Sequence, residues 1–446
     1  MGSTGRPGCR APGRRPAAVR AGAGALAGAL LVAVAGCAGA DAEGGPPALT
    51  WYINNQNQEA LAERCSQEAD GYTIETSLLP ASNAAQREQL LRRLAANDRS
   101  IDVLSLDPPF MAEFANAGFL REFTEEEAAE LSEGVLDGPL EQSLFDGAMY
   151  IAPFYGNTQL LWYRRSVAQA AGLDPAAGPV TWDQLIEAAE QTGTTVAVQG
   201  LRNESMTVWV NALVESSGGT ILADGQEGAP ADEVRAAIDS EAGAAAAELI
   251  SRIATSPAAP PALSTAGEES SRAAFQADDG GFMVNWPYVW AAFAAAVESG
   301  SVPADFLDDV GWTRYPRVDP GTPSATPLGG IGLGVGAFSE HPDLAVEAVR
   351  CLRSEQSQTE YMLAAGDPAA SAAVYDDPAV REAFPMWEAI REGLVDAAPR
   401  PITPFYGDVT GSVQQSFHPP AALSPETTPA RTAALIEGVL SNDRLL

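Results

Sequence analysis

The alternation of strand-like and helix-like segments between residues 48 and 109 restricts the possible folds more than any other feature of the chain. Short apolar runs with β-branched and aromatic residues predict strands: ALTWYIN (48–54), YTIETSLLP (72–80) and IDVLSLDPP (101–109). Between them, NQEALAERCSQEA and AAQREQLLRRLAAND carry apolar residues at helical spacing. This order requires crossover connections, so it predicts an α/β fold with a parallel sheet covered by helices.

A second α/β region is predicted for roughly residues 155–329. MYIAPFYGNTQLLWYRR (149–165) predicts an extended segment, and TWDQLIEAAEQT and VWVNALVESSGG predict helices. GTPSATPLGG (321–330) has a linker-like composition and leads to the glycine-rich strand IGLGVGAFS, and HPDLAVEAVRCLRSEQSQTEYML predicts one periodic helix. Two α/β halves with several crossings suit a hinged two-lobe binding protein whose ligand cleft lies between the lobes, at the carboxyl ends of strands.

Composition and charge exclude some classes of partner. The chain has 446 residues and 46% hydrophobic residues, enough for two or three folded domains. Its net charge is −33, and all 26 of its basic residues are arginines. Such a field repels nucleic acid, which we exclude as a partner. The acidity fits either adaptation to a salty or crowded envelope or a biased genomic composition.

The first 37 residues resemble a targeting signal. Several arginines precede the apolar run AGAGALAGALLVAVAG (21–36), which is short for a membrane span and typical of a signal peptide, residues 1–36. The run ends in VAGC, which resembles a bacterial lipobox and predicts lipidation of Cys37; the alternative is an ordinary signal peptide with a chance cysteine. Residues 37–48 predict a flexible tether. We therefore expect an extracytoplasmic protein with a lipid anchor in the cell membrane.

Cysteine usage agrees with that compartment. Cys9 lies in the predicted signal peptide and Cys37 would take lipid, which leaves Cys65 and Cys351. A single pair in an oxidising environment predicts a disulfide. The alternative is two buried free thiols that act as small apolar residues.

Catalytic, metal and cofactor signatures are weak. The two histidines, His341 and His418, have no neighbours at metal-ligand spacing, and no G-x-S-x-G motif occurs. GLGVGA (332–337) fits a loose dinucleotide pattern, but a strand with close backbone approach explains it better. We expect no metal, no cofactor and no catalytic residues.

Polar and aromatic residues at predicted strand ends suit a polyol such as a sugar. Amides, carboxylates and arginine pair with hydroxyl groups, and an aromatic ring covers the C–H face of a sugar. The candidates are Asn54, Asn55, Arg87, Asp107, Asn157, Glu269, Trp286, Tyr288 and Arg400.

These residues also have plainer explanations. Asp107 precedes two prolines and could simply form a turn, and Asn157 could act as a cap. Arg87 could be a solvated residue on a helix face, and Trp286 could belong to the core. Pro287 prevents a regular helix or strand interior after Trp286, which favours a turn that presents the ring. The sequence leaves core and site equally open for Trp286.

Several segments, in order, resemble one family from about residue 49 to the end. They are LTWYIN, QREQLLRRLAANDRSIDVLSLDPPFMAEFANAGFL, APFYGNTQLLWYRR, VTWDQLIEAA, AAFQADDGGFMVNWPYVW, GGIGLGVGAFSEHPDLAVEAVRCL and RPITPFYGDVTGSVQQSF. They resemble the extracellular solute-binding proteins of sugar-importing ABC transporters, and most of all the trehalose-binding lipoproteins of actinobacterial importers.

The resemblance implies a periplasmic-binding-protein-like fold and a division of the chain. Residues 49–154 and 330–368 would form lobe 1, and residues 155–329 and 369–446 would form lobe 2. Sugar hydroxyls would be bound from lobe 1 by Arg87 and Asp107, at the crossing by Asn157, and from lobe 2 by Glu269, Tyr288 and Arg400. Trp286 would be the stacking platform, and Gly330 would let the backbone approach the sugar. Some relatives carry an acid near Asn54 and Asn55, so asparagine there departs from the pattern.

We therefore predict a monomeric, non-enzymatic lipoprotein that binds a disaccharide, trehalose first, and delivers it to ABC permease subunits. The alternatives are an extracytoplasmic glycoside hydrolase and a binder of a non-sugar solute. With 59 acidic residues, a pair of carboxylates at hydrolase spacing can be imagined anywhere, so the sequence offers no positive sign of that chemistry.

Overall fold

The first three strands pair in parallel, as their alternation with helices predicts. The structure is a computed structural model that describes residues 45–225 and 228–446. Strand β1 (Ala48–Ile53) lies between β2 (Thr73–Leu78) and β3 (Val103–Leu106). Helices α1 (Glu59–Glu68) and α2 (Asn83–Ala95) connect them. The ends of β1 and β3 therefore meet at one edge of the sheet.

Two later strands complete this sheet. Strand β11 (Thr326–Val335) pairs antiparallel with β3 and with β6 (Ile151–Thr158), and the short β12 (Ala397–Ala398) adds to the start of β11. The resulting order is β12-β11-β3-β1-β2, with β6 on β11, six strands in the described residues. The linker predicted for residues 321–330 is thus wrong over its second half, which is already strand. Glycine is tolerated in this strand because β6 approaches closely: a Cβ at Gly330 would lie 2.2 Å from the Tyr155 carbonyl oxygen.

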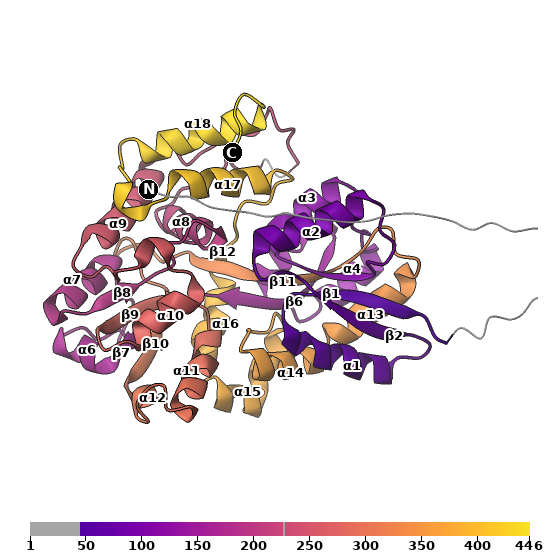
Figure 1. The fold of residues 1–446 in the computed structure, drawn as a ribbon, viewed down its shortest axis with the longest axis horizontal. Helices are drawn as coiled ribbons and strands as arrows, with labels where there is room; N and C mark the ends of the chain where they lie inside the picture. Colours follow the sequence, from indigo (N-terminus) through magenta and orange to yellow (C-terminus); the bar gives the residue numbers. More distant parts are fainter. Residues whose placement is uncertain (1–44, 226–227) are drawn as a thin grey trace, which may run out of the picture. The chain divides into compact units, whose positions relative to one another are not determined.

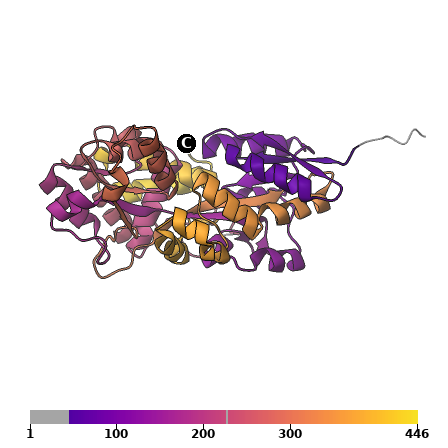
Figure 2. The ribbon, with the colours of Figure 1, turned by 90° about the horizontal axis from the view of Figure 1, so that it is seen from below.

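The six-stranded sheet is buried on both faces. One face packs against α1, α13 (Pro342–Leu352) and α14 (Glu355–Ala365), and the other against α2 and α3 (Met111–Asn116). Along β1 the side chains alternate accordingly, with Trp51 on the first face and Tyr52 on the second. The indigo α1 lies beside the orange α13 and α14, although these segments are far apart in the sequence (Figures 1 and 2).

A second sheet of four strands has the order β10-β7-β9-β8 within the described residues. Its strands are β7 (Leu160–Arg164), β8 (Thr195–Ala197), β9 (Gly280–Asn285) and β10 (Val310–Thr313). Strand β7 begins two residues after β6 ends, so the chain passes from one sheet to the other at Gln159. Its side chains alternate between two cores, with Leu161 in one and Trp162 in the other.

Helices cover both faces of this second sheet. On one side lie α7 (Trp182–Thr192), α8 (Glu204–Ser216), α9 (Glu241–Thr255), α17 (Tyr406–Ser416) and α18 (Thr428–Leu440). On the other lie α10 (Glu268–Gln276), α11 (Tyr288–Glu298), α12 (Phe306–Asp309), α15 (Pro378–Ala383) and α16 (Trp387–Val395). The yellow α17 and α18 lie beside α8 and α9 in Figure 1, so the end of the chain belongs with this sheet.

The remaining elements are short. They are α4 (Glu125–Ser132), α5 (Asp137–Glu141), α6 (Arg165–Ala170), β4 (Leu144–Phe145), β5 (Ala148–Met149), and the 3-10 helices η1 (Gln56–Gln58), η2 (Pro108–Phe110), η3 (Leu263–Thr265), η4 (Ala372–Asp376) and η5 (Pro420–Ala422). The single helix predicted over residues 341–363 is two, α13 and α14, which meet at Ser354, the N-cap of α14. Serine is favoured at an N-cap because its hydroxyl accepts a hydrogen bond from a backbone amide in the first turn of the helix.

Cys65 on α1 is bonded to Cys351 on α13, with an S–S distance of 2.02 Å. The bond joins two helices on the same face of the six-stranded sheet and so fastens the start of the chain to its return into that sheet. Across the described ranges, no helix has the length and apolarity needed to cross a bilayer. The predicted signal peptide, Cys9, Cys37 and the tether up to residue 44 lie outside the described residues.

Candidate functional site

A cavity of about 730 Å³ opens at the carboxyl ends of strands from both sheets. Asn54 follows β1, Asp107 follows β3, and Trp286 follows β9. Open α/β sheets bind ligands at this edge. Eight of the residues selected from the sequence line the cavity: Asn54, Arg87, Asp107, Asn157, Trp286, Tyr288, Gly330 and Arg400.

Two selected residues, Asn55 and Glu269, are not among those that line this cavity. The Asn55 side chain caps η1 by accepting from the Asn57 amide at 3.0 Å. Glu269 pairs with Arg272 on α10 at 2.8 Å. The preceding residue, Glu268, lines the cavity instead, and its Oε1 accepts from Ser205 Oγ at 2.6 Å. Successive residues of a helix point about 100° apart, so only one of two adjacent acids can face a given cavity.

Trp286 lies in the turn between β9 and α11. The Asn285 side chain accepts from the Trp286 amide at 2.9 Å, and the Asn285 carbonyl accepts from Trp162 Nε1 at 3.0 Å, so the turn is tied to β7. The ring covers Gly329 of β11: a Cβ at that glycine would lie 3.1 Å from Trp286 Cη2. The half-buried ring therefore forms part of the cavity wall and is not enclosed in either core.

Arg400 joins carboxylates from two separate parts of the fold. Its Nη2 donates to Asp107 Oδ1 at 2.9 Å and its Nη1 to Glu204 Oε1 at 2.6 Å. Glu204 begins α8 and also accepts from Thr410 Oγ1 at 2.8 Å and from the Tyr406 hydroxyl. Burial raises the pKa of Glu204, and the neighbouring Arg400 opposes that rise. One buried cation thus holds two buried carboxylates at the cavity wall.

Arg87 reaches the cavity from α2 and is paired there. Its Nε and Nη2 both donate to the carboxylate of Glu113, and the guanidinium lies 5.8 Å from the centre of the Phe110 ring. The guanidinium also contacts α17, since a Cβ at Gly407 would lie 2.7 Å from its Nη2. Arg87 is therefore a cavity-lining residue fixed by its contacts with Glu113 and Phe110. It is not a freely solvated residue on the helix face.

The wall nearest the strand crossing is built from polar side chains. Asn54 Nδ2 donates to the Tyr155 hydroxyl at 3.2 Å, and Asn157 Nδ2 donates to Asp367 Oδ1 at 3.4 Å. Gly330 has a φ of +131°, and a Cβ there would lie 2.2 Å from the Tyr155 carbonyl oxygen. Glycine is required at this position by the close approach of strands β6 and β11, before any ligand is considered.

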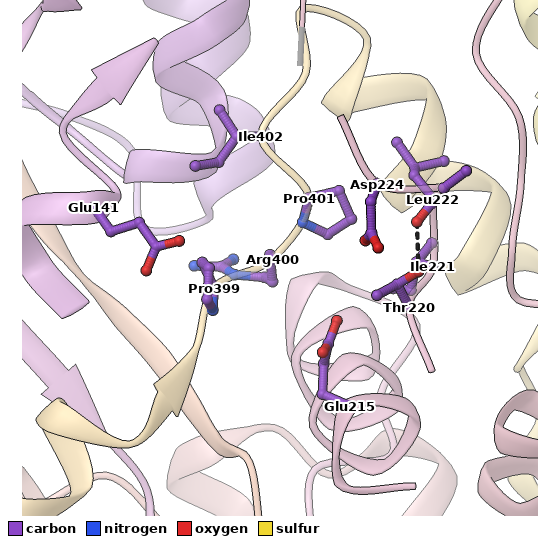
Figure 3. A pocket seen from close by; sticks show the side chains of 11 residues that line it. Glu141, Glu215, Thr220, Ile221, Leu222, Asp224, Pro399, Arg400, Pro401 and Ile402 are labelled. Carbon is purple, nitrogen blue, oxygen red and sulfur yellow. Dashed lines mark hydrogen bonds between the residues drawn. The ribbon is translucent and has the colours of Figure 1, made fainter. Parts of the chain in front are cut away.

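A smaller cavity of about 170 Å³ lies against another part of Arg400. Figure 3 shows Glu141 and Glu215 among its lining side chains, with the segment Pro399–Ile402 passing through it. Burial raises the pKa of Glu215 to about 7, and the nearby Asp224 adds to the rise. Arg400 lines both cavities, so the segment that carries it separates them.

Sequence reasoning missed Glu204, Glu268, Tyr155 and Asp367, all of which line the larger cavity. Glu204 and Glu268 each begin a helix, where acids are common for electrostatic reasons alone, so they gave no distinct signal. Asp367 lies between Gly366 and Pro368, a pattern that first indicates a turn. In the part of the chain that the structure describes, no group of three or more His, Cys, Asp or Glu side chains could hold a metal ion.

This arrangement, two α/β sheets joined by crossing strands with a cavity at their carboxyl edges, is the periplasmic-binding-protein fold. The chain belongs to the bacterial extracellular solute-binding proteins, whose family model matches residues 55–359. Members of this family are extracytoplasmic binding proteins and not enzymes, so the hydrolase alternative is set aside.

Individual relatives agree with that assignment. A probable ABC transporter-binding protein of Deinococcus radiodurans is 26% identical over 398 residues, covering 85% of this chain and 90% of its own length. The maltose-bound structure of T. maritima MalE3 is similar with a TM-score of 0.76 and 26% identity, over 88% of this chain and 99% of its own. The cyclic α-maltosyl-1,6-maltose binding protein of Arthrobacter globiformis shares the fold, with a TM-score of 0.70 at 20% identity over 89% and 100% of the two chains.

Proposed function

We propose that this protein is the lipid-anchored substrate-binding component of an ABC importer, and that it binds a disaccharide, with trehalose as the first candidate. It captures the sugar outside the cytoplasm and presents it to the permease subunits, and it acts as a monomer. Closure of the two halves around the sugar would exclude water and create the surface that the permease recognises.

The observation that carries this proposal is that the Trp286 ring and polar side chains able to pair with hydroxyl groups line a single cavity. Trp286 offers an apolar face, and Asn54, Asn157 and Asp367 offer amide and carboxylate groups around it. A sugar ring has the same two chemistries, C–H faces and a rim of hydroxyls. The cavity volume of about 730 Å³ falls in the range that holds small ligands.

Trehalose is preferred among sugars because of the sequence segments that resemble trehalose-binding lipoproteins. Support for a disaccharide of glucose units also comes from the similar T. maritima MalE3, whose structure holds maltose. Structures of other proteins with this fold hold ribitol or D-mannitol, so acyclic polyols are the competing ligands.

A thermal-shift screen followed by titration calorimetry tests the proposal. The purified protein is heated with trehalose, maltose, sucrose, ribitol or mannitol, because a ligand that binds only the folded state raises Tm with its saturation. We expect the largest rise with trehalose and a stoichiometry near one. If only maltose or sucrose raises Tm, that sugar would take the place of trehalose in the proposal. If only a non-sugar solute raises Tm, the carbohydrate assignment would be overturned.

The anchor is tested separately. Cys37→Ala should move the protein from the membrane fraction to the soluble fraction and leave sugar affinity unchanged, because residue 37 is not among the residues that line the cavity. Detergent partitioning of wild type and variant measures this. A variant that stays in the detergent phase would contradict lipidation at Cys37.

A further inference from the structure

Asp367 differs in its charge balance from Asp107 and Glu204, two other carboxylates of the larger cavity. Asp107 and Glu204 both pair with Arg400. Asp367 lines the same cavity, but within residues 45–225 and 228–446 it forms no ion pair. A half-buried negative charge without a cation needs hydrogen-bond donors to stabilise it.

The backbone holds Asp367 in place. Gly366, with a φ of +80°, ends α14 in the left-handed conformation, and the Pro368 carbonyl accepts from the Gly156 amide of β6 at 3.1 Å. The chain on both sides of Asp367 is therefore fixed to α14 and to β6. The carboxylate consequently has a defined position at the cavity wall.

Two neutral donors reach the carboxylate and do not saturate it. The Tyr361 hydroxyl donates to Oδ2 at 3.1 Å and Asn157 Nδ2 donates to Oδ1 at 3.4 Å. An ionised carboxylate accepts about four hydrogen bonds, so each oxygen keeps capacity for another donor. The cavity is the open side from which such donors can come.

The carboxylate lies close to the aromatic platform. Asn157, which contacts Asp367, is also a neighbour of Gly329, the glycine that the Trp286 ring covers. On the other side, Gly366 packs against the backbone of Tyr288, two residues after Trp286. A ring stacked on Trp286 would thus have its rim within reach of Asp367.

We propose that Asp367 is a specificity-determining residue of the carbohydrate site: its carboxylate accepts hydrogen bonds from free hydroxyl groups of the sugar ring stacked on Trp286. This inference rests on the proposed function. The Asp367 carboxylate would favour neutral sugars with unmodified hydroxyls at that ring and would disfavour phosphate or uronate groups there, because among the described residues no arginine forms an ion pair with Asp367.

The proposal has a consequence for pH. Burial raises the pKa of Asp367 to about 6, and the Tyr361 hydrogen bond limits that rise. The other titratable groups that act on it among the described residues are Tyr361 of α14 and Tyr155 of β6, whose pKa values burial raises, so they stay neutral at these pH values. Below pH 6 Asp367 gains a proton and loses an acceptor. Sugar affinity should therefore decrease as the pH is lowered, by up to about tenfold for each pH unit below 6.

The test compares Kd for trehalose and maltose at pH 7.5 and pH 5.0, by titration calorimetry, in wild type and Asp367→Asn. Asparagine keeps the shape but cannot ionise. We expect wild type to bind about five- to tenfold more weakly at pH 5.0 than at pH 7.5, and Asp367→Asn to bind about tenfold or more weakly than wild type at pH 7.5 with no further loss at pH 5.0. Glu215→Gln, which removes a titrating acid of the smaller cavity, is the matched control and should keep the wild-type profile.

A second variant leaves Asp367 in place. Tyr361→Phe removes the donor that lowers the Asp367 pKa, so the midpoint of the affinity loss should move to higher pH. Wild-type affinity and pH profile in Asp367→Asn would overturn the inference while leaving the proposed function intact. If wild type binds neither disaccharide at pH 7.5, the proposed function fails and this inference falls with it.

Discussion

Arg400 Nη2 lies 2.9 Å from Asp107 Oδ1, which links the last crossing segment of the chain to the end of β3 in the six-stranded sheet. The same guanidinium pairs with Glu204 at the start of α8, beside the four-stranded sheet. The side chains of Arg400 and Asp107 are only 4% and 7% exposed. A buried pair of this kind contributes little over an apolar substitute, but removal of one partner leaves an uncompensated charge.

We expect Asp107→Asn to lower the free energy of unfolding by about 1.5–3 kcal/mol, the range for loss of a hydrogen bond to a charged group. The loss should stay within that range because Glu204 still pairs with Arg400. Urea unfolding followed by tryptophan fluorescence measures it.

The control for this variant is an exposed ion pair. Arg99 and Glu340 lie 3.0 Å apart with side chains 72% and 59% exposed. Glu340→Gln should therefore change the free energy of unfolding by less than about 1 kcal/mol. An equal decrease in the free energy of unfolding in the two variants would show that burial of the Arg400 pair does not increase its contribution to stability.

Trp286→Ala should weaken disaccharide binding by more than about tenfold, because an apolar contact of this size contributes about 1.5–3 kcal/mol. The ring covers Gly329 at the cavity wall. Trp286 and Tyr288 are the two residues with aromatic rings in FMVNWPYVW that line the cavity, so the substitution leaves only Tyr288. Titration calorimetry on the folded variant gives the change in Kd.

Trp290 in the same stretch provides the matched control. Its ring stacks on Trp162 with centroids 6.4 Å apart, its Nε1 donates to the Ala383 carbonyl at 3.1 Å, and it is not among the residues lining the cavity. Trp290→Ala should lower Tm and leave Kd within about twofold. A Trp286→Ala variant that binds as well as wild type would return Trp286 to a packing role.

The parallel strands were predictable because β-branched runs and helical spacing are local properties of the chain. Asp107, Trp286 and Arg400, selected from the sequence, all line the larger cavity, and each is adjacent to a proline that marks the end of a segment. The partner that each side chain meets depends on contacts between distant segments. The pairing of Arg400 with Glu204, and of Asp367 with Asn157, joins residues 196 and 210 positions apart, which no local pattern reveals.

Differences between expectation and structure have similar causes. Glu268 lines the cavity and Glu269 does not, and this depends on which face of α10, the face with buried Phe275, packs against the core, which composition does not reveal. The linker assigned to residues 321–330 failed because glycine and proline usually indicate turns, whereas β11 uses them where β6 crosses closely.

Glu215→Gln should change how stability depends on pH. The pKa of Glu215 is about 7 in the folded protein and near its ordinary value of 4.5 when unfolded. Between these values the unfolded chain ionises first, so wild type loses stability as pH rises through this window. Because Glu215 is half-buried, the variant should be more stable than wild type by on the order of 1–2 kcal/mol at pH 8 and by little at pH 4.5.

Urea unfolding of both proteins at pH 4.5, 6 and 8 measures this difference. The comparison with the variant isolates Glu215 from the many other acidic groups, which both proteins share. A difference that is the same at all three pH values would contradict a raised pKa at this position. Sugar affinity serves as a further control and should match wild type at each pH.

The bond between Cys65 and Cys351 should make both thiols unreactive in the unfolded, unreduced protein. A Cys37→Ala variant that begins after the predicted signal peptide lacks both Cys9 and Cys37, so any labelled thiol must come from this pair. The two cysteines are 286 positions apart, and chain entropy sets an upper limit of about 5–6 kcal/mol on the stabilisation from such a loop.

Replacement of both cysteines by serine should lower Tm. Affinity should stay unchanged, because the bond joins α1 to α13 on one face of a single sheet, away from the cavity residues. Two reactive thiols per unreduced chain would mean that the pair is buried but not bonded.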